Sequence, residues 1–426
     1  FNIYMFHGGT SFGPMSGANS SDKDPYVPYV TSYDYDAPLD EAGRPTEKYL
    51  AVRNVIKKHL PSGETLAKLP ETLPLIELPE IEMTESASLL TSLDKVSKAV
   101  RAPKPVTMEA AGQSYGLILY RTRLPRDVQG ALENKEVHDY ALVFNGQKRL
   151  GTIDRSRGET SVKVALNSMA PLDILVEQMG RINYGRRVIG ESKGITGGVV
   201  LAGTELRGWE IYPLPLDNLN ALTFKPTLRT KQKPNGPLTT PTFYRGNFKV
   251  SETGDTFLDM RGWGKGYVWI NGRNLGRFWR IGPQQTLFLP APWLKRGQNE
   301  IVILDLEGGE ARTVRGLRDP VYHTPPQLLL FGDYDVEFVS THILWRISMK
   351  PIPSYPLWLS ASMLLGPLFM VSGIAFRDRW LIWVFQSVGA LMVILALFYL
   401  SKRLHEQMEE VASLRILLNS RDDRQG

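Results

Sequence analysis

Apolar and polar positions in the middle of the chain follow the pattern of short β-strands. From about residue 115 to 215, and again from 240 to 307, brief apolar runs rich in β-branched and aromatic residues are separated by turn residues. Such spacing is typical of a β-sandwich. The clearest predicted strands are residues 116–122, 140–144, 172–176, 266–270 and 300–304. The pattern therefore predicts two consecutive β-rich regions.

Residues 1–60 follow a different pattern, that of a strand, a loop and a helix. The alternating apolar residues at the start predict a strand, and Gly8 and Gly9 after it allow positive φ or a close backbone approach. Pro45 and Thr46 are helix start signals. The apolar face of the predicted helix consists of Tyr49, Val52, Ile56 and Leu60. This order is one βα unit of a parallel sheet or barrel. Because no initiator methionine or basic leader precedes it, we expect the chain to begin in mid-domain.

The last part of the chain is strongly apolar. Residues 356–376 and 380–400 are uncharged runs of about the length that crosses a bilayer, separated only by Arg377-Asp378-Arg379. Tryptophan and tyrosine near their ends are typical of membrane interfaces, whereas a pair of buried core helices is the alternative. Residues 401–426 predict a short amphipathic helix. We expect this tail to reach the membrane, with one span at 380–400.

Two details suggest that the β-rich regions are related. Phe144-Asn145-Gly146 is followed by Leu150-Gly151, and Ile270-Asn271-Gly272 by Leu275-Gly276. Each Asn-Gly pair predicts a type I′ hairpin turn, in which both central residues have positive φ. We interpret the two regions as an internal duplication of one sandwich module. Residues 61–105, which show no sustained period, are interpreted as a linker with short strands.

Composition excludes several classes of function. The chain has 426 residues, of which 42% are hydrophobic and 22% charged, as expected for a folded protein of more than one domain. The net charge of +6 is spread over mixed acidic and basic residues, which gives no indication of nucleic-acid binding. There is no cysteine, and the six histidines lack metal-ligand spacing, so neither a metal nor another cofactor is expected.

Three motifs resemble a known family. They are residues 2–13 (NIYMFHGGTSFG) with 31–39 (TSYDYDAPL), residues 176–185 (VEQMGRINYG), and residues 262–279 (GWGKGYVWINGRNLGRFW). In this order they are similar to the last barrel strand and substrate loop, the first accessory β domain and the galactose-binding-like jelly roll of glycoside hydrolase family 35 β-galactosidases. The resemblance covers about residues 1–322.

The resemblance implies a mostly β fold with some helix. Residues 1–60 correspond to the incomplete end of a (β/α)8 barrel, 106–225 to the first accessory β domain, and 226–322 to the galactose-binding-like jelly roll. These are two β-sandwich domains. The hydrophobic tail at 345–426, with one or two transmembrane helices, lies beyond the resemblance.

The resemblance also implies a function, the retaining hydrolysis of terminal β-galactose residues from glycans, glycolipids or disaccharides, in the lysosome, the vacuole or outside the cell. Retaining hydrolysis needs two carboxyl groups about 5 to 5.5 Å apart. In the family both are glutamates on earlier barrel strands, upstream of Tyr4, so we assign no catalytic residue here. For the acidic residues near the substrate loop, Asp34, Asp36, Asp40 and Glu41, we expect solvated turn or helix-start roles.

By the same resemblance, four tyrosines contact the substrate. Tyr35 matches the residue that hydrogen-bonds galactose, and Tyr4, Tyr33 and Tyr244 match aromatic positions of the same pocket. A tyrosine suits a sugar because its ring covers the C–H face and its hydroxyl bonds to sugar hydroxyls. The alternative for each is an ordinary core residue of a strand. For the tryptophans of the third motif, Trp263, Trp269 and Trp279, we expect a buried core rather than a carbohydrate platform.

Two other classes of function are open at this stage. One is a non-catalytic carbohydrate-binding module built on the jelly roll. The other is a chimeric membrane protein in which the galactosidase resemblance is vestigial. The coding sequence upstream of Phe1 distinguishes them, because only the enzyme requires both glutamates there.

Overall fold

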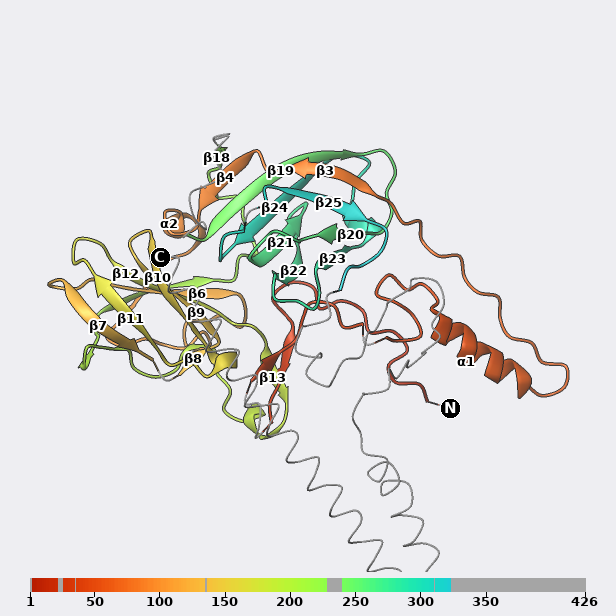
Figure 1. The fold of residues 1–426 in the computed structure, drawn as a ribbon, viewed down its shortest axis with the longest axis horizontal. Coiled ribbons are helices and arrows are strands. Elements are labelled where there is room, and N and C mark those ends of the chain that lie inside the picture. Colours follow the sequence, from red (N-terminus) through yellow and green to blue (C-terminus); the bar gives the residue numbers. More distant parts are fainter. Residues whose placement is uncertain are drawn as a thin grey trace, which may run out of the picture. The chain divides into compact units, whose positions relative to one another are not determined.

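A computed structural model describes residues 2–21, 26–34, 36–134, 136–227, 240–309 and 311–322 (Figure 1). The chain divides into two compact units, Phe1–Pro326 and Gln327–Gly426, and all of the described residues belong to the first. The two apolar runs and the amphipathic helix predicted for the tail therefore lie outside the described residues. Within the described ranges, no helix has the length and apolar character needed to cross a bilayer.

The first sandwich consists of a six-stranded sheet, with strand order β10-β9-β12-β6-β17-β5, and a four-stranded sheet, β11-β7-β15-β16. Their bounds are β5 (Val100–Ala102), β6 (Leu117–Thr122), β7 (Val128–Glu133), β9 (Tyr140–Asn145), β10 (Lys148–Asp154), β11 (Ser161–Leu166), β12 (Leu172–Glu177), β15 (Val200–Leu201), β16 (Thr204–Glu205) and β17 (Trp209–Leu214). Strands β8 (Val137–His138) and β14 (Gly194–Ile195) form a separate pair. The three strands predicted in this region are confirmed as β6, β9 and β12.

The second sandwich also combines six strands, β18-β4-β19-β24-β21-β22, with four, β23-β20-β25-β3 (Figure 1). Their bounds are β3 (Leu78–Glu82), β4 (Glu85–Ser88), β18 (Lys225–Pro226), β19 (Thr242–Val250), β20 (Thr256–Asp259), β21 (Lys265–Ile270), β22 (Arg273–Trp279), β23 (Thr286–Leu289), β24 (Gly297–Asp305) and β25 (Thr313–Leu317). The predicted strands at 266–270 and 300–304 are confirmed as β21 and β24. Strands β3 and β4, from the stretch interpreted as a linker, belong to this sandwich.

The two six-stranded sheets are buried on both faces. On β6, Leu119 and its neighbour Tyr120 belong to two different core clusters. The cluster of Leu119 also contains Tyr267 and Trp269 of β21, so it joins the larger sheets of the two sandwiches. Burial on both faces explains why these strands are continuous apolar runs instead of alternating ones. Trp263 and Trp269 are buried, as expected for a core, and Trp279 is half-buried.

The two sandwiches share one strand order, which supports the interpretation as a duplication. In the first, the hairpin β9–β10 is followed by β11 in the smaller sheet and by β12, which returns beside β9. In the second, β21–β22 is followed by β23 in the smaller sheet and by β24 beside β21. The returning strand, β12 or β24, has a second neighbour on its other side, β6 or β19. In each sandwich this second neighbour comes before the hairpin in the chain.

The two hairpin turns differ, however. Asn271 and Gly272 have φ of 50° and 80°, as the type I′ prediction requires. In the first hairpin Asn145 pairs with Lys148, so the central residues are Gly146 and Gln147, and only Gly146 has positive φ, at 61°. The type I′ prediction is therefore wrong for this turn, which has glycine at its first central position as type II′ turns do.

The N-terminal segment contributes one long helix and two short strands. Helix α1 (Glu47–Lys58) is confirmed, and the Thr46 hydroxyl caps it by accepting a hydrogen bond from the backbone N–H of Tyr49. Strands β1 (Gly17–Asn19) and β2 (Val27–Pro28) form a sheet with β13 (Arg181–Tyr184). The short helix α2 (Leu93–Val96) and three 3₁₀ turns, η1 (Arg155–Arg157), η2 (Arg186–Val188) and η3 (Ala291–Trp293), complete the described elements.

The opening strand predicted at the start of the chain is not formed. Residues 2–6 contain a turn and a bend, and no described strand pairs with them. A strand depends on a neighbour to satisfy its backbone N–H and C=O groups. Without one, the alternating apolar pattern of these residues is insufficient, and the described residues of 1–60 do not form a barrel.

Candidate functional site

A cavity with a volume of about 1100 Å³ lies on the N-terminal segment. Its lining includes Tyr4 and Tyr33 and apolar residues of α1, among them Val52 and Ile56. We call this cavity the tyrosine groove. The structure thus brings two of the four predicted substrate tyrosines together. Tyr4 is 88% exposed, whereas Tyr33 is half-buried.

Glycines hold the backbone of Tyr33 in place beneath the groove. The Tyr33 N–H donates to the Gly9 carbonyl at 2.9 Å. A Cβ on Gly8 would lie 1.7 Å from the Tyr33 carbonyl oxygen, and Gly9 has φ of 74°. The sequence-based expectation of a close approach or positive φ at these glycines is confirmed, because one supplies each. The ring of Tyr33 contacts that of Tyr29 edge-on, with centroids 5.8 Å apart.

Of the other two predicted tyrosines, the structure describes Tyr244 alone. Tyr35 lies outside the described residues. Tyr244 is 3% exposed and belongs to the core of the second sandwich, where its ring packs edge-on against Trp263 at 5.5 Å. The cause is the alternation along β19, since Tyr244 and Phe248 point to one face of the strand and Phe243 to the other.

The acidic residues near the groove divide into two kinds. Asp36 is exposed and pairs with Lys48 at 2.6 Å, and a carboxylate oxygen of Asp40 accepts a hydrogen bond from the Arg44 backbone at 2.8 Å. These two have the turn and surface roles expected of them. Glu41 does not, because its side chain is buried, and the prediction of a solvated residue is wrong there. Burial raises its pKa to about 7, although hydrogen bonds from Thr10 and Ser32 oppose the shift.

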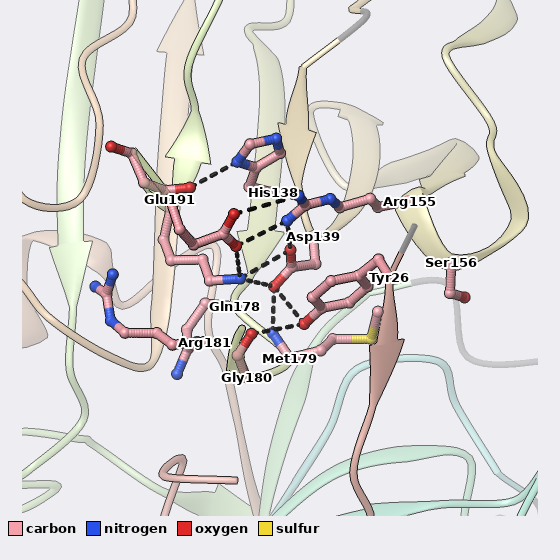
Figure 2. A network of polar contacts seen from close by, with 12 residues as sticks. Tyr26, His138, Asp139, Arg155, Ser156, Gln178, Met179, Gly180, Arg181 and Glu191 are labelled. Atoms are coloured by element: carbon pink, nitrogen blue, oxygen red, sulfur yellow. Dashed lines mark hydrogen bonds and ion pairs between the residues drawn. The ribbon is translucent and has the colours of Figure 1, made fainter. Parts of the chain in front are cut away.

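A buried ion cluster that sequence reasoning missed lies beside the motif at 176–185 (Figure 2). Lys193 and Asp139 are fully buried and pair at 2.8 Å, and Lys193 also pairs with Glu191 at 2.7 Å. Arg155 reaches Asp139 at 2.7 Å and Glu191 at 2.9 Å. Tyr26, from the N-terminal segment, donates its hydroxyl to Asp139 at 2.8 Å, and burial is the main cause that raises the pKa of this phenol. The cluster ties the N-terminal segment to the first sandwich.

A second buried cluster connects the two sandwiches. Glu177, at the end of β12, forms an ion pair with Lys265 of β21 and accepts a hydrogen bond from the Tyr267 hydroxyl at 2.8 Å. The Lys265 ammonium lies 4.1 Å and 4.4 Å from the ring centroids of Tyr140 and Trp279. None of these residues lines the tyrosine groove. The motif at 176–185 therefore has a structural role between domains.

Within the described ranges, no three histidine or acidic side chains are grouped so that they would hold a metal ion. The groove instead offers aromatic rings, aliphatic side chains and a few polar groups, among them Asn19 and Lys48. Such a surface suits a neutral ligand with both apolar faces and hydroxyls.

Comparisons with known proteins match the same three parts of the chain. Residues 1–59 match the model of glycosyl hydrolases family 35. Residues 105–215 match the first all-beta domain of beta-galactosidase, and residues 241–299 its galactose-binding domain.

Several curated relatives are similar over most of the described residues. A beta-galactosidase of Xanthomonas manihotis is 41% identical over 294 residues, which is 68% of this chain and 46% of the relative. Human beta-galactosidase-1-like protein 3 is 38% identical over 317 residues, covering 72% of this chain and 46% of the relative. The beta-galactosidase of Bos taurus is 37% identical over 357 residues, with coverage of 76% and 52%. The chain spans about half the length of these relatives. By its three domain matches and these relatives, the chain belongs to glycosyl hydrolase family 35 as a β-galactosidase-like protein.

Proposed function

We propose that the protein to which this chain belongs is a retaining β-galactosidase, which hydrolyses terminal non-reducing β-D-galactose residues of glycans, glycolipids or disaccharides. One observation carries the proposal: the residues that line the tyrosine groove, all but Leu60, lie within residues 1–59, which match the family 35 model. In this proposal residues 1–60 are the end of a (β/α)8 barrel. The groove then supplies part of the galactose pocket.

Tyr4, Tyr33 and Tyr35 are the proposed substrate contacts. Tyr4 and Tyr33 share one groove, and Tyr35 follows Tyr33 by two positions in the same loop. Each phenol presents an apolar ring to the sugar face and a hydroxyl to the sugar hydroxyls. Tyr244 is left out because its ring is enclosed in the second sandwich.

The test is activity in the complete protein. By family resemblance, the two catalytic glutamates lie upstream of Tyr4, on earlier barrel strands. The coding sequence upstream of Phe1 is read first, and the complete protein is then assayed for galactose release from a chromogenic β-galactoside. Turnover that is lost when either glutamate is replaced by glutamine supports the proposal. A complete protein with both glutamates and no turnover on any β-galactoside refutes it.

A galactose-binding module without catalysis is the second candidate, favoured by the match of residues 241–299 to a galactose-binding domain. Calorimetric titration of the chain with galactose separates the two. Binding that survives Tyr33→Phe and Tyr4→Ala, in a protein without turnover, supports the module. The burial of Trp263 and Trp269 removes two aromatic rings that would otherwise serve as a sugar platform there.

For location, we propose a lysosomal or extracellular enzyme portion anchored by a single span at residues 380–400. A hairpin of both apolar runs would place the enzyme portion and the C-terminus on the same side, and the basic flanks Arg346, Lys350, Lys402 and Arg403 would make that side cytoplasmic. A single span leaves the enzyme portion lumenal. Protease protection of microsomes with tags at both ends decides: accessibility of the C-terminal tag alone supports one span, and equal accessibility refutes it.

A further inference from the structure

The loop that carries Tyr33 is built from two segments that pair with each other. The Ser11 N–H donates to the Thr31 carbonyl at 2.8 Å, and the Tyr33 N–H donates to the Gly9 carbonyl at 2.9 Å. A bridge between Thr10 and Ser32 lies between these two bonds. We call residues 7–13 and 31–34 together the paired loop.

Beneath the paired loop lies the carboxyl group of Glu41. The Thr10 hydroxyl donates to Glu41 Oε1 at 2.6 Å, and the Ser32 hydroxyl is a second hydrogen-bond partner. Glu41 therefore contacts one residue from each segment of the loop. Its side chain is 4% exposed, and among the described residues no lysine, arginine or histidine lies within ion-pair distance of its carboxyl group. The loop thus contacts a buried carboxyl group that has no counter-ion among the described residues.

The second sandwich holds the same loop from another direction. The Ser32 N–H donates to Gln284 Oε1 at 2.8 Å, and the Ser32 hydroxyl lies 3.3 Å from that of Tyr322. The Thr31 hydroxyl donates to the Arg277 carbonyl at 2.6 Å. These contacts involve neutral groups that keep their protonation state between pH 5 and 8. Among the described groups that contact Thr10, Thr31 and Ser32 here, Glu41 supplies the one whose charge changes in that range.

We propose that Glu41 is a positioning residue that holds the paired loop, and with it Tyr33, in place while its carboxyl group is protonated, and that loosens the loop when it ionises. This positioning role rests on the proposed function in one respect, namely that Tyr33 lines the proposed substrate groove. A protonated carboxyl accepts the Thr10 hydrogen bond and donates its own O–H to Ser32, so both contacts are kept without a buried charge. The ionised form keeps the acceptors but leaves the charge desolvated.

The negative charges near Glu41 act in the same direction as its burial, whereas its hydrogen bonds to Thr10 and Ser32 act against it. Burial is the largest cause of its raised pKa of about 7, and the negative charges of Asp34 and Asp40 add to it. The other titratable groups that face it are Tyr322, whose pKa burial raises to about 12, and His7, whose ring lies 3.4 Å from the Glu41 backbone carbonyl. Since the folded form binds the proton more tightly than an unfolded chain with a pKa of 4.5, this contribution is complete below about pH 4.5 and is lost as the pH rises through about 7.

Hydrogen–deuterium exchange of the 426-residue chain tests the proposal without any ligand. Exchange in peptides covering residues 7–13 and 26–34 is followed from pH 5 to pH 8 and corrected for the intrinsic rate at each pH. One proton allows the opening equilibrium to change by at most about tenfold per pH unit. We expect the corrected opening of wild type to rise by up to that slope between pH 5 and 7 and then level off.

The variant Glu41→Gln should abolish this rise, because a neutral amide accepts from Thr10 and donates to Ser32 at every pH. The matched control is Glu47→Gln, at an exposed position in the first turn of α1, which should keep the wild-type profile. Thr10→Val removes a hydrogen bond that lowers the Glu41 pKa and should move the midpoint to higher pH. If Glu41→Gln fails to fold, the midpoint shift in Thr10→Val still tests whether the Glu41 carboxyl group controls the opening of the loop.

A flat wild-type profile, or the same slope in Glu41→Gln as in wild type, overturns the role of Glu41. Neither result depends on galactose. A pH-dependent loop in a protein that neither binds nor hydrolyses galactosides would instead refute the proposed function and leave the role of Glu41 standing.

Discussion

Replacing Lys265 by methionine should destabilise the joint between the two sandwiches more than any change to a surface ion pair. Lys265 is fully buried, with its ammonium on Glu177 and against the rings of Tyr140 and Trp279. Methionine fills a similar volume but removes the charge. Glu177, which is 1% exposed, is then left with the Tyr267 hydroxyl as its hydrogen-bond donor.

The magnitude follows from the burial of the partner that remains. Breaking a buried ion pair by removing one member costs about 3–5 kcal/mol, because the other charge stays desolvated. The cation–π contacts add about 1–2 kcal/mol when they are shielded from water, which favours the upper part of that range. In the double variant Lys265→Met/Glu177→Gln the stranded charge is gone, and we expect most of the loss to be recovered, because replacing both members of a buried pair is often close to neutral.

The assay is urea unfolding of the chain, followed by tryptophan fluorescence, which reports on Trp269 and Trp279 near the joint. The control is Arg101→Met, since Arg101 is 83% exposed in its pair with Glu210 and should contribute less than about 1 kcal/mol. A loss below about 1 kcal/mol in Lys265→Met contradicts the reasoning. A double variant that is no more stable than Lys265→Met also contradicts the reasoning. The unpaired, buried charge of Glu177 would then not be the cause of the destabilisation.

Three further predictions concern the groove and the first ion cluster. The purified 426-residue chain should release no galactose from a chromogenic galactoside, because the family resemblance places both catalytic glutamates outside it; detectable release would contradict this. In the complete enzyme, Tyr35→Phe should lower kcat/KM by an amount equivalent to about 1–3 kcal/mol, and unchanged kinetics in a folded variant would remove Tyr35 from the site. Tyr26→Phe should cost about 1–3 kcal/mol in urea unfolding, since its hydroxyl oxygen lies 2.8 Å from both Asp139 and the Gly180 carbonyl oxygen and donates its one proton to either, and a cost near zero would show that the cluster tolerates its loss.

The central strands could be predicted from the sequence because both of their faces are buried. Strands β6, β12 and β21 are largely apolar runs of the length of a strand, and a run of that length between turn signals is typical of a buried strand. Helix α1 could also be predicted from the sequence, because Thr46 caps it and its apolar residues follow the helical period. In the strands the local sequence and the tertiary environment favour the same structure, whereas α1, which has no buried residue, follows from its local sequence.

The edge strands and the opening strand could not be predicted in the same way. Strand β3 has the sequence Leu-Pro-Glu-Ile-Glu, and it is a strand because β25, far along the chain, pairs with it. The apolar residues 2–6 have the alternation of a strand and lack such a partner. Pairing at the edge of a sheet is decided by distant segments, and neither composition nor period records it.

The site shows the same limit for side chains. The resemblance predicts Tyr4, Tyr33 and Tyr244 as substrate contacts; the structure places Tyr4 and Tyr33 along one groove, whereas the alternation of β19 places Tyr244 in a core. The sequence predicts a solvated role for every acidic residue near the loop, yet Glu41 is buried while Asp36 is exposed. Whether a carboxyl group is solvated depends on the segments that surround it, and those near Glu41 include Tyr322, which follows the last strand of the second sandwich.

The three motifs that carry the family resemblance meet at Arg277, and this meeting links the sandwiches to the groove. The Arg277 guanidinium, from the third motif, donates to the Met179 carbonyl of the second motif at 2.6 Å and to the Tyr29 carbonyl just before the substrate loop. Its own carbonyl accepts the Thr31 hydroxyl of the first motif. At the preceding residue, Gly276 has φ of 125°, and a Cβ there would lie 2.4 Å from the Thr31 methyl group, so only glycine allows the approach. The contacts of Arg277 therefore help to position the loop that carries Tyr33, and replacing Arg277 should move Tyr33 although Arg277 itself does not line the groove.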